Sequence, residues 1–124
     1  MKINMKQDVK NKTLKEAYSE FEKQCSIKNL SEKTIKYYGD CFKSFIQFYG
    51  EFNSLSDISK DTIDDYIIHL KTNTGFNNIS INTRLRGIRT IFKHFMELGY
   101  IENFKITLIK AEKEIKETYT DAEF

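Results

Sequence analysis

The sequence contains no proline, no tryptophan and only five glycines in 124 residues. Turn-rich β folds need proline and glycine between their strands, so this scarcity favours an all-helical fold. Cys25 and Cys41 do not form a CxxC pair, and the N-terminus lacks the apolar stretch of a signal peptide. No apolar run approaches the ~20 residues needed to span a membrane. We therefore expect reduced, buried thiols in a cytoplasmic protein with no membrane partner.

Aromatic side chains are abundant, with ten Phe and seven Tyr, and the hydrophobic content of 40% can build the core of one domain. The net charge is only +2, but the charge is segregated along the chain. Residues 51–73 carry two bases against five acids, and residues 74–96 carry four bases and no acid. Segregation of this kind produces a surface that binds a charged partner.

Four segments each show a single apolar stripe at helical spacing, as a compact helical bundle requires. Thr13 and Glu16 form a capping-box pattern at the start of the first segment, and Ser31 and Ser59 are good N-caps for the second and third. The expected helices cover residues 13–29, 31–49, 59–73 and 80–99, with Gly50 and Gly99 as stop signals. Asn77 and Asn78 are assigned to the loop before the fourth helix.

The two ends of the chain lack such a stripe. Residues 1–12 are polar and rich in lysine, and we expect a flexible arm there. Residues 104–124 are dominated by Lys and Glu with no clear helix cap, so we interpret them as a linker or tail that does not dock firmly on the bundle.

The fourth helix contains every arginine of the protein, and its side chains form two distinct faces. One face is apolar and contains Ile81, Leu85, Ile88, Phe92 and Phe95. The second face, within about 60° of arc, contains Asn82, Arg86, Arg89 and Lys93. A basic face with an amide and no carboxylate suits nucleic acid, although a basic face exposed only to solvent is the other interpretation. Arg84 projects nearer the apolar face, and it either turns outward to DNA or pairs within the fold.

The start of the second helix adds Lys33, Thr34 and Lys36 to the candidate DNA contacts, because the free N–H groups of a helix N-terminus also favour phosphate. The alternative for Thr34 is a local capping role.

Two of these segments resemble motifs of a known family. Residues 30–38, Leu-Ser-Glu-Lys-Thr-Ile-Lys-Tyr-Tyr, and residues 80–93, Ser-Ile-Asn-Thr-Arg-Leu-Arg-Gly-Ile-Arg-Thr-Ile-Phe-Lys, are similar to runs in the core-binding domain of tyrosine recombinases, the phage-integrase family. The resemblance covers residues 13–103. It implies a four-helix, SAM-like orthogonal bundle that forms half of a C-shaped clamp on double-stranded DNA, with the second and fourth helices facing the major groove.

The same resemblance implies that residues 104–124 lead to a catalytic domain absent from this sequence. The chain alone would then be inactive, with no catalytic residue of its own, and Tyr119 would not be the nucleophile. We expect a monomer in isolation and a parent protein that assembles as a multimer on DNA.

Other functions have less support. His69 and His94 lack metal-ligand spacing, and no motif indicates a metal or a cofactor. The main competitor is a helical adaptor that binds another protein through the acidic third helix or an apolar patch near Ile68. A salt titration of DNA binding distinguishes the adaptor from the DNA-binding domain.

Overall fold

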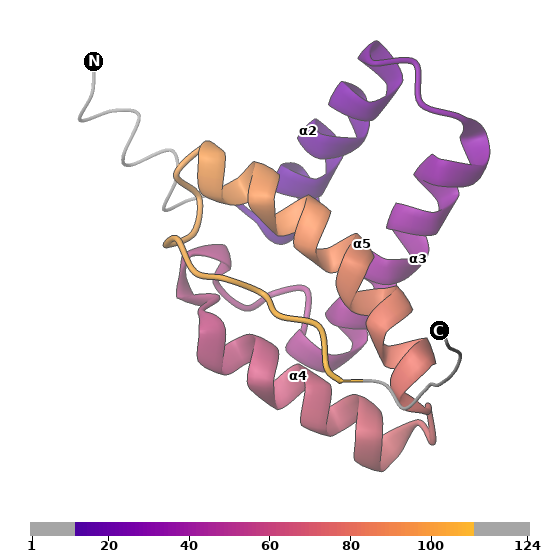
Figure 1. The fold of residues 1–124 in the computed structure, drawn as a ribbon. Coiled ribbons are helices and arrows are strands. Elements are labelled where there is room, and N and C mark those ends of the chain that lie inside the picture. The colour runs from indigo at the N-terminus through magenta and orange to yellow at the C-terminus, as the bar shows by residue number, and fades with distance from the viewer. Residues whose placement is uncertain (1–11, 111–124) are drawn as a thin grey trace.

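The computed structural model describes residues 12–110, and within them the chain forms α-helices, one short 3-10 helix and no strand (Figure 1). The elements are α2 (Leu14–Ile27), α3 (Glu32–Tyr49), η1 (Leu55–Asp57), α4 (Lys60–Asn73) and α5 (Asn78–Glu97). The predicted all-α, compact four-helix bundle is confirmed. None of these helices combines the length and the apolar character needed to cross a membrane.

The helix starts follow the predicted caps. The Thr13 hydroxyl accepts from the Glu16 N–H at 3.1 Å, and the Glu16 carboxylate accepts from the Thr13 N–H at 3.0 Å. The Ser31 hydroxyl likewise accepts from the N–H of Thr34 at 3.1 Å. These side chains satisfy backbone donors that have no partner inside the helix.

The start of α5 differs from the prediction. Asn77 is the N-cap, and its side-chain oxygen accepts from the Ser80 N–H at 2.9 Å. Asn78 is the first helical residue, so its assignment to a loop was wrong. The cause is that asparagine caps a helix as well as serine does, which moves the start two residues upstream of Ser80.

Helix α5 crosses the middle of the molecule, with α2 and α3 on one side and α4 on the other (Figure 1). Its most extensive packing is against α3. At the centre of the core, the ring of Phe45 meets the rings of Tyr66 and Phe92 edge-on, with centroids 5.3 and 5.1 Å away. Leu55 and Ile58, in and after η1, are also buried and belong to the same core.

The crossing of α3 and α5 depends on a residue with no side chain. Gly87 of α5 lies against Cys41 of α3, and a Cβ at position 87 would lie 2.4 Å from the Cys41 sulfur. Cys41 and Cys25 are free cysteines, and the prediction that both are buried is confirmed. Desolvation raises the pKa of each thiol. Buried thiols with raised pKa are structural rather than reactive.

The chain after α5 does not behave as the expected linker. Residues 101–110 turn back and run between α5 and α4 (Figure 1), with Ile101 and Ile106 buried. Phe104, Leu108 and Ile109 pack partly buried against the same core. The expectation that this part lacks a docking face was therefore wrong for residues 104–110, because its apolar residues alternate along an extended chain rather than at helical spacing. Residues 111–124, including Tyr119, lie outside the described residues.

Most of the expected N-terminal arm, residues 1–11, also lies outside the described residues, but Lys12 is placed. Its ammonium lies 2.6 Å from the Glu20 carboxylate and 5.4 Å from the centre of the Tyr100 ring. The Tyr100 hydroxyl donates to the same carboxylate. Lys12 and the Tyr100 hydroxyl together lower the pKa of Glu20. Lys12 therefore joins α2 to the end of α5 and is not part of a free arm.

Candidate nucleic-acid interface

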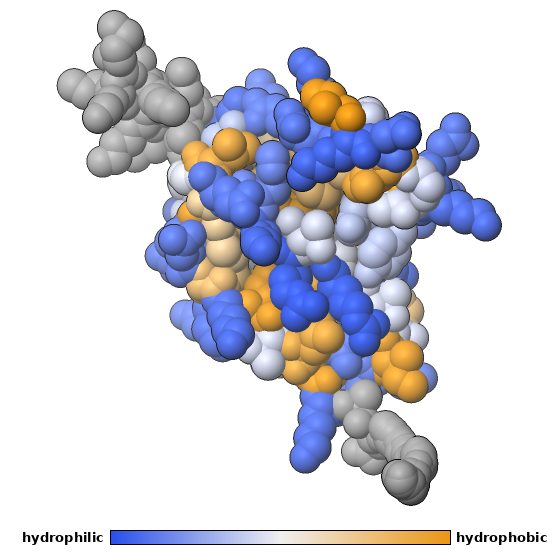
Figure 2. Space-filling model, turned by 45° about the horizontal axis from the view of Figure 1, so that its top comes forward, coloured by the Kyte–Doolittle hydropathy of each residue, from blue (hydrophilic) through white to orange (hydrophobic). Residues whose placement is uncertain are grey.

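Three cations of α5 form an exposed row that we call the basic stripe: Arg86, Arg89 and Lys93. They occupy the outer side of the helix because Leu85, Ile88 and Phe92 between them are fully buried. Among residues 12–110, no carboxylate lies within ion-pair distance of the three. Hydrophilic and hydrophobic residues are interspersed over the face of the molecule in Figure 2. The stripe is thus positive charge without an internal partner, which is suited to phosphate or to base edges.

Asn82, predicted to extend this stripe, has another role. Its side chain is only 6% exposed. Its amide group donates to the Ile109 carbonyl at 2.8 Å and accepts from the Ile109 N–H at 2.9 Å. The docked segment covers Asn82 and occupies both ends of its amide. We therefore leave Asn82 out of the interface and assign it to holding residues 101–110.

Arg84 turns toward the fold, which was one of its two predicted alternatives. Its guanidinium lies over the ring of Phe76, 4.9 Å from the centroid, in a half-buried position. Its Nε is buried and has no acceptor among the described atoms. The side chain lines an open pocket between α3 and α4, with Lys43 and His69 nearby. Arg84 is therefore set apart from the basic stripe.

The first turn of α3 presents Lys33, whose side chain is exposed and has no ion-pair partner among the described residues. Lys36 is also exposed, but its ammonium lies 3.2 Å from the Asp40 carboxylate, one turn along the helix. The Thr34 hydroxyl accepts from the hydroxyl of Ser31 at 2.9 Å, which fits the capping alternative. Of the three predicted residues, Lys33 has the least competition for a phosphate.

Tyr37 links the two helices that carry these cations. Its hydroxyl donates to the Thr83 carbonyl of α5. Burial, together with the neighbouring Cys41, raises the pKa of Tyr37 to about 12. A hydroxyl that bridges two helices fixes their spacing, and hence the distance between Lys33 and the basic stripe. Nothing local in the sequence reveals this partner, which lies forty-six residues away.

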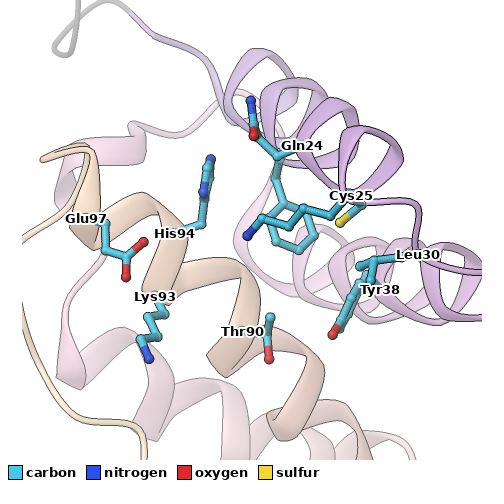
Figure 3. A pocket seen from close by; sticks show the side chains of 10 residues that line it. Gln24, Cys25, Leu30, Tyr38, Thr90, Lys93, His94 and Glu97 are labelled. Carbon is cyan, nitrogen blue, oxygen red and sulfur yellow. The ribbon is translucent and has the colours of Figure 1, made fainter.

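An open pocket of about 250 Å³ adjoins the stripe between α2, α5 and the start of α3 (Figure 3). Thr90, Lys93 and Glu97 come from α5, and His94 is turned toward α2, where its ring meets Phe21 edge-on. The His94 Nε2 is buried without a partner among the described atoms. In residues 12–110, no three His, Cys, Asp or Glu side chains cluster to hold a metal ion. The pocket extends the exposed surface beside the basic stripe toward α2.

Comparison with protein-family models matches residues 6–102 to the model described as "Phage integrase, N-terminal SAM-like domain". The match spans both motifs that carry the resemblance in the sequence and all the helices of the described bundle. No curated protein matches the chain, and no solved structure matches it.

Proposed function

The chain belongs to the family of phage integrase N-terminal SAM-like domains, and from this premise we propose that it grips double-stranded DNA at the site where a tyrosine recombinase acts. Helix α5 would enter the major groove through Arg86, Arg89 and Lys93. Lys33, at the start of α3, would contact the phosphate backbone beside it.

The observation that carries this proposal is the unpaired charge of the basic stripe. An exposed cation in a folded domain often has a carboxylate one turn away, as Lys36 and Lys60 have here. Arg86, Arg89 and Lys93 form no ion pair among the described residues, although Glu97 lies one turn along α5 from Lys93 and the chain has nearly as many acids as bases. Mutually repelling cations on one helix face cost stability, and a polyanionic partner offsets that cost.

Family membership implies a parent protein that is a tyrosine recombinase. We propose that the strand cleavage and rejoining are performed by residues outside this bundle, which positions the DNA for them. The described residues supply cations and a rigid helix pair, and we assign none of them a covalent step.

Titration of mixed-sequence duplexes followed by fluorescence anisotropy tests the proposal. Arg86→Ala and Arg89→Ala should each weaken binding by about 1–3 kcal/mol if the arginine grips a guanine, and by less if it contacts only phosphate. Lys71→Ala is the matched control, because it removes the same charge from an exposed position on α4. It should change the affinity by less than about 0.5 kcal/mol.

Stability must be measured on the same variants. Replacing exposed cations opens no cavity, so the free energy of unfolding should change by no more than about 0.5 kcal/mol. Equal DNA binding by the parent, Arg86→Ala and Arg89→Ala would show that the stripe is only a solvated face. Absence of duplex binding even at low salt would instead favour a helical adaptor that binds another protein.

A further inference from the structure

An exposed apolar side chain lies beside the basic stripe on the outer side of α5. Ile79, in the first turn of α5, has a side chain that is 63% exposed. On a helical wheel it lies within about 20° of Arg86, two turns further along the helix. The fold does not bury this isoleucine, so its apolar side chain is free to contact whatever partner the neighbouring arginines bind.

Two threonines add to this apolar component. Thr83 and Thr90 are exposed on the same side of α5. Their hydroxyls donate to carbonyls one turn back, Thr83 to Ile79 at 3.0 Å and Thr90 to Arg86 at 3.2 Å. A hydroxyl that donates to its own helix is not available to donate to a ligand. These threonines therefore offer mainly their methyl groups to a partner.

The outer side of α5 thus alternates apolar groups with arginine. In the major groove of B-DNA, arginine recognises the O6 and N7 atoms of guanine, and apolar groups recognise the C5-methyl of thymine. We propose that Ile79 and Thr83 contact thymine methyl groups beside a guanine bound by Arg86. This inference rests on the proposed DNA-gripping function and specifies which bases the helix reads.

The geometry also limits the spacing of these bases. Ile79 and Arg86 are separated by seven positions, or about 10 Å along the helix axis. One base-pair step is about 3.4 Å, so the thymine lies within about three base pairs of the guanine. The Tyr37 hydrogen bond to the Thr83 carbonyl holds this part of α5 against α3. It therefore keeps Ile79 and Thr83 at a fixed distance from Lys33 on α3.

Replacement of thymine by deoxyuridine tests the inference, because it removes only the C5-methyl group. The probe is a duplex enriched by the full chain from a random-sequence pool, with each thymine replaced singly. At one or two positions the replacement should weaken binding about fourfold, the ratio expected for one buried methyl-sized group. Ile79→Ala should weaken binding to the thymine duplex by a similar factor and abolish the difference between thymine and deoxyuridine at one of these positions, the one that Ile79 contacts.

Ile68→Ala is the matched control, since Ile68 is 58% exposed on α4. It should retain the full preference for thymine. Equal binding of every deoxyuridine duplex by the parent would overturn the inference while leaving DNA binding intact. Equal weakening of both duplexes by Ile79→Ala would also overturn it, because the isoleucine would then act on something other than the methyl group. A chain that binds no duplex at all would refute the proposed function instead.

Discussion

Asn82 and Ile109 exchange two hydrogen bonds, from the Asn82 amide to the Ile109 carbonyl at 2.8 Å and from the Ile109 N–H to the Asn82 oxygen at 2.9 Å. This pair imitates the backbone pairing of two strands, but one partner is a side chain on a helix. It anchors the returning segment 101–110 to the first half of α5. Asn82 is buried and Ile109 is partly buried, so water replaces a lost partner poorly if either side of the pair is removed.

Asn82→Ala should therefore destabilise the protein by about 1–3 kcal/mol, the cost of leaving the partly buried backbone N–H and C=O of Ile109 without partners. Chemical denaturation measures this change. Asn78→Ala is the control, because Asn78 makes one longer bond, 3.4 Å, to the Lys110 carbonyl. Asn78→Ala should lower the free energy of unfolding clearly less than Asn82→Ala. Equal stability of Asn82→Ala and the parent would contradict the anchoring role.

The helices were predictable from sequence because their signals are local. Caps such as Thr13 and Ser31 lie next to the backbone groups they satisfy, and each apolar stripe repeats within its own helix. Only the start of α5 was displaced, since Asn77 and Ser80 are both acceptable caps.

The docked segment and the role of Asn82 were not predictable in this way. A helical wheel shows that Asn82 lies off the apolar stripe, but it does not show that Ile109, twenty-seven residues away, covers it. The basic stripe itself is exposed as expected, because cations are rarely buried without a partner. Contacts within the fold thus took Asn82 and Arg84 out of the predicted site and left Arg86, Arg89 and Lys93 exposed.

Gly87→Ala should destabilise the bundle by about 1–3 kcal/mol through overpacking. The new methyl would lie 2.4 Å from the Cys41 sulfur and 2.9 Å from its Cβ, so α3 and α5 would have to separate. Cys41→Ala in the same protein should restore part of the loss. Thermal or urea unfolding of the single and double variants measures the coupling.

Gly39→Ala tests the same substitution at an ordinary helical position. The nearest atom to its new methyl is the Tyr18 hydroxyl at 3.5 Å, a normal contact. Alanine is about 0.5–1 kcal/mol more favourable than glycine in a helix interior, so Gly39→Ala should stabilise the protein. Stabilisation by both variants would show that the crossing at Gly87 is not tight.

Alkaline pH should destabilise the fold as its buried tyrosines lose their protons. Burial raises the pKa of Tyr37 to about 12 and also raises that of Tyr66. A raised pKa means that the folded state holds the proton more tightly than the unfolded state. The stabilisation is therefore fully present below about pH 10, the ordinary tyrosine pKa, and is lost as the pH rises toward about 12.

Urea unfolding at a series of alkaline pH values, with tyrosinate absorbance recorded in parallel, checks this prediction. Tyr37→Phe should lose less stability than the parent over the same interval, because it has no proton to release there. Constant stability from neutral pH to about pH 12 would contradict the raised pKa values.

The salt dependence of DNA binding should report how many cations remain available after folding. Arg84 lies over Phe76 and Asn82 is occupied by Ile109, which leaves Arg86, Arg89, Lys93 and Lys33 as the exposed, unpaired candidates. Neutralisation of three or four phosphates gives a slope of log K against log salt of roughly −3 to −4.

Lys93→Ala should reduce the magnitude of this slope by about one if Lys93 contacts a phosphate. Arg84→Ala should leave the slope unchanged, because its guanidinium lies within the fold. A slope that falls by the same amount for Arg84→Ala would mean that Arg84 leaves Phe76 to reach the DNA, and the boundary drawn here for the interface would be wrong.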